Sequence, residues 1–232
     1  DDGIHFTKLG VVLPIGATGE FDDVNAHGPS ALIRDGRTWL YYEGEDGINA
    51  RSGLAISDDG IHFTKLGVVL PLGAAGEIDD VSLYRPLAII RDGRTWLYYS
   101  AYDGSKLRNA LAISDDGIHF TKLGVVLPLG ASGDFDDSWT VHGYPIIRDA
   151  RTWLYYVGYD GGNKRTGLAI SDDGIHFTKL GVVLPIGATG EFDDRHTYGP
   201  SAIIRDGRTW LYYSPFDGSN ARIGLAVSEL GL

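Results

Sequence analysis

Short apolar runs separated by turn signals fill the chain, and the first set of runs shows the pattern. Each run is rich in β-branched or aromatic residues, and none repeats its apolar positions every 3.6 residues, which favours strands over helix. Asp-Gly pairs that begin at Asp35, Asp46 and Asp59 separate the runs and predict tight turns, because Gly accepts a positive φ. The strands predicted for this first set are 26–34, 37–43, 52–57 and 61–69.

The same pattern returns with a fixed period. The sequence DDGIHFTKLGVVLP begins at Asp1, Asp58, Asp115 and Asp172, 57 residues apart each time. Units 1 and 4 differ at only eleven of 57 positions, so the units form one array rather than separate domains. We therefore expect a single domain over residues 1–232, built from the units 1–57, 58–114, 115–171 and 172–228.

Equal units of four strands predict the blades of an all-β propeller. A β-sandwich is the alternative, but a sandwich does not need equal units. The chain starts with a fourth strand, residues 4–13, and ends with a third strand, residues 223–228. We therefore expect the N-terminal strand to complete the last blade, which would close a ring of four blades and hide an exposed edge. The other arrangement is an open ring that another chain completes.

One hairpin turn departs from the rest. Three units have Asp-Gly between their first and second strands, whereas the third unit has Asp149-Ala150. A type I′ turn needs a positive φ at both central residues, and Ala in that conformation costs roughly 1 kcal/mol. The sequence therefore predicts a strained turn at Ala150.

Composition narrows the classes of function. The chain has no Cys, which excludes disulfides, thiolate metal sites and a Cys nucleophile. A net charge of −11 argues against a nucleic-acid partner, whose phosphates require a basic surface. No run of eighteen apolar residues predicts a membrane span, and residues 1–25 do not have the pattern of a signal peptide. The compartment stays open, since extracellular and cytoplasmic locations both fit.

The positions at which the units differ predict the functional surface. The extra aromatic and His residues fall in residues 24–30 and 43–52 of unit 1 and in their equivalents. Because strands alternate in direction, both windows reach one face of the ring, around the mouth of the central channel. Neutral drift in loops is the alternative, but drift would also have changed the Gly-rich connector 14–23, which hardly varies. A symmetrised natural propeller that keeps its original site would show the same pattern.

The repeated motif carries a family resemblance. GEFDD…PSALIRDGRTWLYYEG…RSGLAISDDGIHFTK resembles the furanosidase-like β-propellers, five-bladed glycoside hydrolases that include arabinanases, β-xylosidases and β-fructosidases, and most of all their uncharacterised relatives. The SDDGIHF turn is similar to the Asp-box hairpin of sialidase-type propellers. The resemblance covers all four units and implies a propeller fold and a carbohydrate ligand. The chain departs from the family in having four units where the family has five blades.

Glycoside hydrolysis usually needs two carboxylates that flank the scissile bond. The resemblance implies acids near the inner strand, where each unit has a repeated Asp pair; a residue present in every blade more often caps a turn. Glu43 and Glu45 are the carboxylates near the predicted mouth that break the repeat. We expect Glu43 to be the candidate acid and Asp23 or Asp80 its partner. A solvated loop charge is the alternative role for Glu43.

A sugar presents apolar faces that stack on Trp and Tyr, and hydroxyl groups that bond to polar side chains. Some of the Tyr side chains would instead pack between blades, and the two Arg residues would alternatively pair with neighbouring Asp residues. No phosphate loop, Ser-His-Asp order or paired-His spacing appears, so we expect neither a cofactor nor a metal site. The expected ligand-binding residues are Asn25, His27, Tyr84, Arg85, Tyr102, Trp139, His142, Tyr144, Tyr159, Arg195, His196, Tyr198 and Phe216.

Three functional hypotheses remain. The favoured one is a carbohydrate-binding or catalytically silent glycosidase-like propeller with its pocket at the channel mouth. The second is an active glycoside hydrolase, and the third is a near-symmetric, amplified or engineered scaffold with no ligand. The unrepeated aromatic residues favour the first over the third, and the scarcity of unrepeated carboxylates favours the first over the second. We expect a monomer, with self-association if the ring is incomplete.

Overall fold

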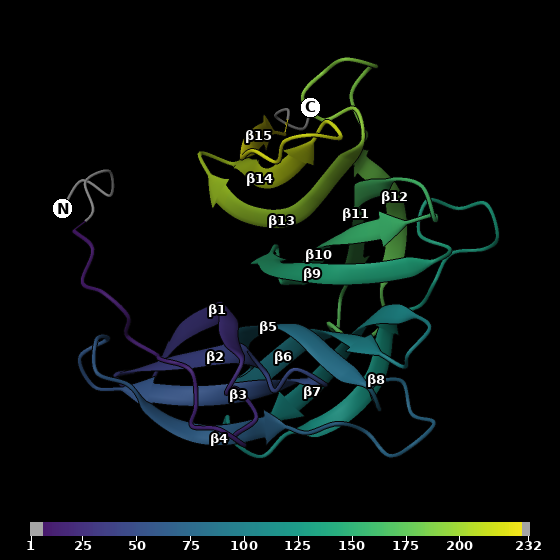
Figure 1. Ribbon diagram of the computed structural model, residues 1–232. Coiled ribbons are helices and arrows are strands. Elements are labelled where there is room, and N and C mark those ends of the chain that lie inside the picture. The colour runs from purple at the N-terminus through teal and green to yellow at the C-terminus, as the bar shows by residue number, and fades with distance from the viewer. Residues whose placement is uncertain (1–6, 229–232) are drawn as a thin grey trace.

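The computed structural model describes residues 7–228, which form strands and turns without any helix (Figure 1). No helix long and apolar enough to cross a membrane therefore occurs among these residues. The strands in this part of the chain are β1 (Asn25–Arg34), β2 (Arg37–Glu45), β3 (Ala50–Ser57), β4 (Thr64–Leu70), β5 (Ser82–Arg91), β6 (Arg94–Tyr102), β7 (Leu107–Ser114), β8 (Thr121–Leu127), β9 (Trp139–Arg148), β10 (Arg151–Tyr159), β11 (Lys164–Ser171), β12 (Thr178–Leu184), β13 (His196–Arg205), β14 (Arg208–Phe216) and β15 (Gly224–Val227).

Each repeat contributes one antiparallel meander, which we call a blade and number 1 to 4 in chain order. Blades 1, 2 and 3 have four strands each, whereas blade 4 has β13, β14 and the short β15. The first strands of successive blades lie next to one another, β1 against β5, β5 against β9 and β9 against β13. This arrangement confirms the predicted all-β propeller class (Figure 1).

The strand boundaries follow the sequence pattern except at the fourth strand of each blade. In blade 1 the fourth strand, predicted from residue 61, begins at Thr64. The preceding residues form a side-chain-capped turn, in which Asp59 Oδ1 accepts hydrogen bonds from the backbone N–H groups of Ile61 and His62, both at 2.8 Å. A carboxylate that satisfies these amides offers the backbone an alternative to the ladder, so the strand starts later.

The core lies between blades rather than within them. The Tyr41 hydroxyl of blade 1 donates to the Gly117 carbonyl of blade 2 at 2.8 Å, and the Tyr41 ring packs edge-on against Phe120. Blades 2 and 3 repeat this contact through the Tyr98 hydroxyl and the Gly174 carbonyl. Blades 1 and 2 thus each depend on the turn between the third and fourth strands of the next blade.

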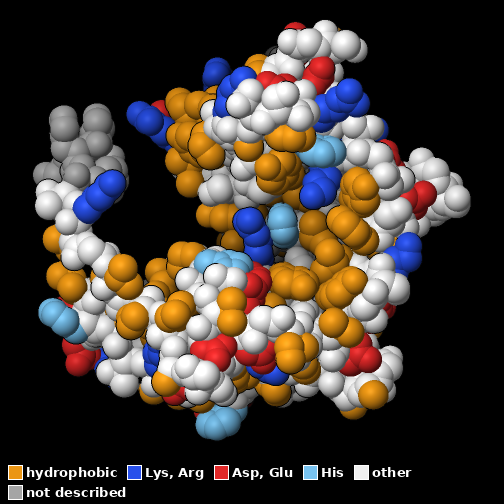
Figure 2. All heavy atoms as spheres, in the orientation of Figure 1, with side chains coloured by type: hydrophobic (Ala, Val, Ile, Leu, Met, Phe, Trp, Pro, Cys, Tyr) orange, Lys and Arg blue, Asp and Glu red, His pale blue; other side chains and the backbone are white. Residues whose placement is uncertain are grey.

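The predicted closure of the ring by the N-terminal strand is not formed. Of the predicted strand 4–13, residues 4–6 lie outside the described residues, and residues 7–13 form no strand. β13 and β1 share no contact comparable to those between the other neighbouring first strands. Figure 2 shows an open notch between blade 4 and the N-terminal segment. The segment leaves blade 1 at a point where blade 4 does not pack beside it. Residues 7–13 therefore have no strand edge next to them with which to pair. A closed ring of four blades is not confirmed.

Blades 3 and 4 are joined more closely than expected. A single parallel pairing of Lys164 with His196 links β11 to β13, so their strands form one continuous sheet. The Lys164 N–H donates to His196 Nδ1 at 3.1 Å, and beside it the N–H and hydroxyl groups of Thr166 donate to the hydroxyl and carbonyl oxygens of Thr197. These polar contacts fix the first strand of blade 4 against the third strand of blade 3.

The turn at Asp149-Ala150 has the backbone of a type I′ turn. Asp149 has φ of 51° and Ala150 has φ of 61°, close to the 51° and 72° of Asp35 and Gly36 in blade 1. Ala150 therefore occupies a left-handed conformation that an L residue with a Cβ adopts at a cost.

We predict that Ala150→Gly raises the free energy of unfolding by about 1 kcal/mol, which corresponds to a melting temperature roughly 2–4 °C higher. Differential scanning calorimetry measures the shift. Ala74→Gly is the matched control, because Ala74 is also exposed but does not have a positive φ, and it should leave stability unchanged or lower it. An unchanged or lower melting temperature for Ala150→Gly would contradict the prediction.

Candidate functional site

The two variable windows meet at one end of each blade. In blade 1 the antiparallel register places Asn25 opposite Glu45 and His27 opposite Glu43. In the other blades the same register sets Tyr84 opposite Ser100, Trp139 opposite Tyr159, and His196 opposite Phe216. The unrepeated residues of the first and second strands therefore share one face, as the strand directions require.

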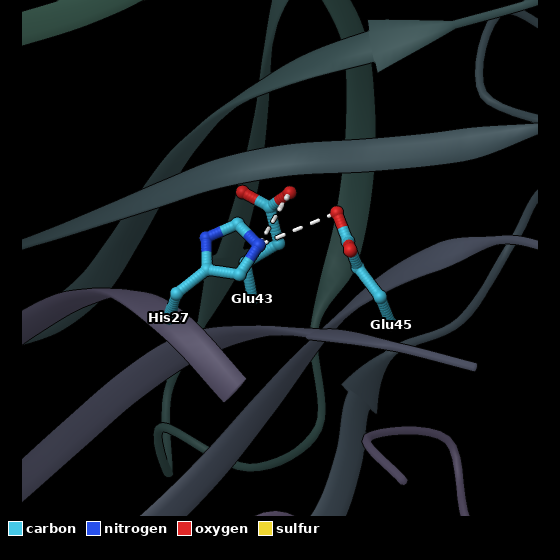
Figure 3. A group of neighbouring side chains, drawn as sticks. All are labelled: His27, Glu43 and Glu45. Atoms are coloured by element: carbon cyan, nitrogen blue, oxygen red, sulfur yellow. Dashed lines mark ion pairs between the residues drawn. The ribbon is translucent and has the colours of Figure 1, made fainter. Parts of the chain in front are cut away.

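Blade 1 carries an acid–base cluster at this face (Figure 3). His27 Nε2 lies 3.3 Å from Glu45 Oε1 and 3.8 Å from Glu43 Oε1, so the imidazole stands between the two carboxylates. Glu43 is only 2% exposed, and its Oε2 accepts a hydrogen bond from the Arg85 backbone N–H at 2.8 Å. The Asn25 side-chain amide donates to Glu45 Oε2 at 2.6 Å. The cluster thus joins the first two blades.

The pKa values of the two carboxyl groups in this cluster are shifted in opposite directions. Burial raises the pKa of Glu43 above its ordinary value, although the hydrogen bond from Arg85 and the neighbouring His27 partly offset the effect. The hydrogen bond from Asn25 and the contacts with His27 lower the pKa of Glu45. A pair whose pKa values are pushed apart has the chemistry of one proton donor and one ionised acceptor.

His27, Glu43 and Glu45 also have the ligand types and the spacing that a divalent cation needs. One ligand atom from each residue lies within 4.8 Å of the others, and no second cluster of this kind occurs among residues 7–228. The His27 side chain is 49% exposed, which leaves an approach from solvent. The trio can therefore hold a proton or a cation between its members.

Asp23 and Asp80, the expected partners of Glu43, lie in the connectors between blades. Asp23 Oδ2 accepts a hydrogen bond from the Gly19 backbone N–H at 2.7 Å, and Asp80 Oδ2 does the same for Gly76. The remaining two blades repeat this bond, which is the behaviour of a structural turn residue. The carboxylate that the structure places beside Glu43 is instead Glu45.

Two adjoining hollows open beside the acid–base cluster. The first, of about 280 Å³, lies where the first strands of all four blades converge. It is lined by Arg85, His142 and Tyr144, together with neighbouring residues of these four strands. The second, of about 200 Å³, is lined by His27, Glu43, Tyr84, Arg85 and His142, together with three neighbouring residues of blades 2 and 3. Arg85 and His142 belong to both hollows, which we together call the mouth.

Arg85 and His142 sit in strained backbone. Their φ angles are 49° and 53°, and the equivalent residues of blades 1 and 4 are Gly28 and Gly199 with φ of 59° and 62°. A left-handed conformation at a bulky residue costs of order 1 kcal/mol and is a feature of functional sites. Burial, with the charges of Arg85 and Lys164, lowers the pKa of His142 to about 3, so its imidazole is neutral at ordinary pH.

Blades 3 and 4 supply the aromatic part of the site. The Trp139 and Tyr159 rings lie 4.6 Å apart, and the His196 and Phe216 rings are stacked at 5.6 Å. Lys164 Nζ lies 6.0, 6.0 and 5.6 Å from the rings of Trp139, Tyr159 and Tyr198, so one ammonium group links the aromatic residues of the two blades. These rings are half-buried, which leaves part of their faces available.

Lys164 was missed by the sequence argument, although it lies in the second variable window. The equivalent positions hold Ala50, Leu107 and Ala221, so Lys164 is a charge that breaks the repeat. The expected polar contacts included Arg85 and Arg195 but not Lys164. Its cation–π contacts are a feature that sequence spacing does not reveal, because the rings come from three strands.

The remaining expected residues lie at the rim. Tyr84 and Tyr102 contact each other with ring centroids 6.3 Å apart, and the Tyr102 hydroxyl donates to the Gly104 carbonyl. Arg195 is exposed, and its backbone carbonyl accepts a hydrogen bond from the Asn163 side chain. Neither Arg85 nor Arg195 forms an ion pair with its neighbouring Asp residues in the described chain, so the alternative role foreseen for them is not seen there.

Comparison with known proteins supports the propeller architecture. No protein-family model matches the chain. The sucrose-6-phosphate hydrolase of Bacillus subtilis (strain 168) is 38% identical over 89 residues, which cover 33% of this chain and 19% of that protein. The match therefore spans about a fifth of the length of the curated relative.

Solved structures match over most of the chain. A family 117 glycoside hydrolase from Zobellia galactanivorans has a TM-score of 0.76 and 19% identity, covering 95% of this chain and 71% of its own. The β-1,2-mannobiose phosphorylase from Listeria innocua, in complex with β-1,2-mannobiose, has a TM-score of 0.71 and 15% identity, covering 88% and 72%. These matches confirm the resemblance to glycoside hydrolase propellers at the level of the fold.

The opposite pKa shifts of Glu43 and Glu45 make a prediction for stability. A carboxyl group whose pKa is raised on folding contributes stability below its unfolded pKa, and this stability is lost as the pH rises through the folded pKa. We therefore expect Glu43→Gln, which keeps an acceptor for the Arg85 N–H, to be more stable than the parent at pH 7.5, with the difference vanishing near pH 4.

Glu45→Gln is the matched control and has the opposite sign. Its lowered pKa means that ionised Glu45 stabilises the fold above its unfolded pKa, so this variant should be less stable at pH 7.5 and equal to the parent at low pH. Melting temperatures of the three proteins from pH 3.5 to 8 test both signs. Equal shifts for both variants would show that burial of Glu43 does not control its titration.

Proposed function

We propose that the mouth binds carbohydrate, as the pocket of a glycosidase-like propeller that is not built for hydrolysis. The observation that carries the proposal is the gathering of the unrepeated aromatic and polar side chains on one face of a repeated scaffold. Tyr84 and Tyr144 line the mouth, and the half-buried rings of Trp139 and Tyr198 lie on the same face of the blades; such rings suit the apolar face of a sugar. Arg85, His27 and Asn25 offer donors for its hydroxyl groups.

The position of His27 between the two carboxylates favours binding over hydrolysis. Carboxyl groups that act as nucleophile and acid lie about 5–5.5 Å apart, and those that act with a water lie about 6.5–9.5 Å apart, with the sugar between them. Oxygens of Glu43 and Glu45 lie within 4.8 Å of each other, and His27 occupies the space between them. A glycosidic bond cannot enter this space unless the imidazole moves.

The sister repeats supply substitutions that remove the site without disturbing the fold. Arg85→Gly and His142→Gly introduce the residue that blades 1 and 4 already hold at the same left-handed position. We predict that each variant is as stable as the parent or more stable. Arg85→Gly should bind sugar roughly tenfold or more weakly, since a hydrogen bond to a charged group contributes about 1.5–3 kcal/mol, and His142→Gly should bind roughly threefold to tenfold more weakly, since a neutral group contributes about 0.5–1.5 kcal/mol.

Isothermal titration calorimetry with fructofuranosyl, arabinofuranosyl and mannosyl oligosaccharides measures this loss. Ile56→Val is the control, because Val227 holds the equivalent position and lies away from the mouth. Binding that survives both Gly substitutions would place the ligand elsewhere. Absence of binding to every sugar by the parent would favour a scaffold without a ligand.

A second candidate function is glycoside hydrolysis, and the divergent pKa values of Glu43 and Glu45 favour it. In that case Glu43 is the proton donor, and Glu43→Gln should lower turnover of aryl furanosides and pyranosides by a factor of at least about 10² while binding changes little. Under the proposal for binding alone, the parent and the variant release no product above the background rate. Turnover by the parent that Glu43→Gln abolishes would establish the enzyme.

A further inference from the structure

A groove of about 400 Å³ lies between blades 3 and 4, away from the mouth. Its walls are apolar and aromatic at the centre, with Trp153, Tyr155 and Leu211, and Arg148 stands at one end. On the other side the groove is bordered by β15, which among residues 7–228 pairs only with β14, so that its second edge is open to the rest of the described chain. Such an edge is a template for another strand.

The equivalent grooves between the other blades are filled by one repeated segment. Between blades 1 and 2, Ile118 and Phe120 pack against the core that contains Tyr41. Between blades 2 and 3, Ile175 and Phe177 pack in the same way around Tyr98. Both pairs belong to the sequence Asp-Asp-Gly-Ile-His-Phe-Thr-Lys, and the chain holds a further copy of this sequence at residues 1–8.

The open edge of β15 fits the strand that follows this sequence. In blade 3 the third strand pairs Gly167 with Val182 and Ile170 with Thr178. Advancing this register by one repeat pairs Gly224 with Val11 and Val227 with Thr7. Within the described chain, residues 7–13 pair with no strand, and Leu9 and Val11 are 69% and 82% exposed. The open edge of β15 and the unpaired segment therefore match residue by residue.

The charges match as well. In blades 1, 2 and 3 a buried Asp receives a Lys of the fourth strand, for example Asp22 with Lys65 at 2.6 Å and Asp79 with Lys122 at 2.7 Å. Asp193 of blade 4 is 8% exposed and bonds to the Tyr213 hydroxyl, but no Lys reaches it among the described residues. Lys8 is the equivalent Lys; it is exposed and contacts no carboxylate in the described chain.

In one molecule residues 7–13 lie across the open notch from blade 4, which forms one wall of the groove (Figure 2). Residues 14–23 are anchored on blade 1 in the connector conformation of the other blades, with the Gly16 N–H bonded to the Asp22 carbonyl as Gly73 is to Asp79. Blade 1 also has an unpartnered face, since Ala31 is exposed whereas the equivalent Ala88 is buried. Both halves of a blade-to-blade contact are thus free in the same chain.

We propose that the groove between blades 3 and 4 binds the N-terminal segment, residues 1–13, of a second copy of this chain. The segment adds a fourth strand to β15, places Ile4 and Phe6 on Trp153 and Tyr155, and brings Lys8 to Asp193. When the segment comes from a second copy, the three interfaces between the blades of each copy stay as they are. A chain that inserts its own segment must first close the notch between blades 1 and 4, which changes these interfaces. Exchange of identical elements between copies is a recognised route to oligomers.

Disulfide trapping tests the proposal, because the chain has no Cys of its own. Thr7→Cys and Val227→Cys, combined in one chain and oxidised with oxidised glutathione, should give covalent dimers or larger oligomers joined by a 7–227 disulfide, identified by peptide mass. Val12→Cys with Val227→Cys is the out-of-register control and should give no such link. A 7–227 disulfide within monomers would overturn the second copy as the source. No 7–227 disulfide at all would overturn the groove as the site.

The charge pair gives an independent measurement on the native chain. Lys8→Glu should weaken self-association at least about tenfold in analytical ultracentrifugation, since it sets two carboxylates against each other at a buried contact. Lys106→Glu is the control, with the same change in net charge at a residue outside the groove and the segment. Equal effects of the two variants, or a parent that stays monomeric at every concentration, would contradict the proposal.

Discussion

One buried carboxylate in each repeat anchors the connector that leads into a blade to the second strand of that blade. Asp22 is almost fully buried; it accepts a hydrogen bond from the Tyr42 hydroxyl of β2 and pairs with Lys65 of β4. An ion of this kind is tolerated in the interior only when its partners replace the water that it loses. The connector that carries Asp22 leads directly into β1, so the same contact that anchors the connector also sets where the first strand begins. The position of the mouth, which consists of the starts of the first strands, depends on this contact in every blade.

The repeat made the blades and their strands predictable, because each local signal is read four times and the four agree. The shared face of the variable windows was also predictable, since antiparallel register alone brings His27 to Glu43. The partner of Glu43 was not. Asp23 looked suitable by its place before β1, but its carboxylate is taken by the Gly19 N–H inside its own connector. The contacts of Lys164 with Trp139 and Tyr198 depend on how two blades meet, and the opening of the ring depends on the angle between blades; neither is encoded in the spacing within a repeat.

A repeated scaffold explains why the chemistry sits where it does. Residues that hold a blade together serve the same contact four times, so a change in one copy alone removes a core contact. The starts of the first strands and the ends of the second strands make no such repeated core contact, and there the copies diverge. Arg85 and His142 show what divergence costs, because each replaces a Gly in a left-handed conformation. Because each copy diverged separately, the site is divided among the blades: its acid–base cluster joins blades 1 and 2, and its Trp139 and His196 ring pairs lie in blades 3 and 4.

The open ring and the mouth are separate consequences of this construction. Glu43 is held by Arg85 across the packed interface of blades 1 and 2, and the Trp139 and His196 pairs lie along the joined sheet of blades 3 and 4. The groove is formed by residues such as Arg148 and Ser228 toward the other ends of the strands, and none of its lining residues lines either hollow of the mouth. A strand that fills the groove would complete blade 4 without touching the ligand residues. It would change the mouth only by bringing another blade against β1, where the half-exposed His27 side chain lies.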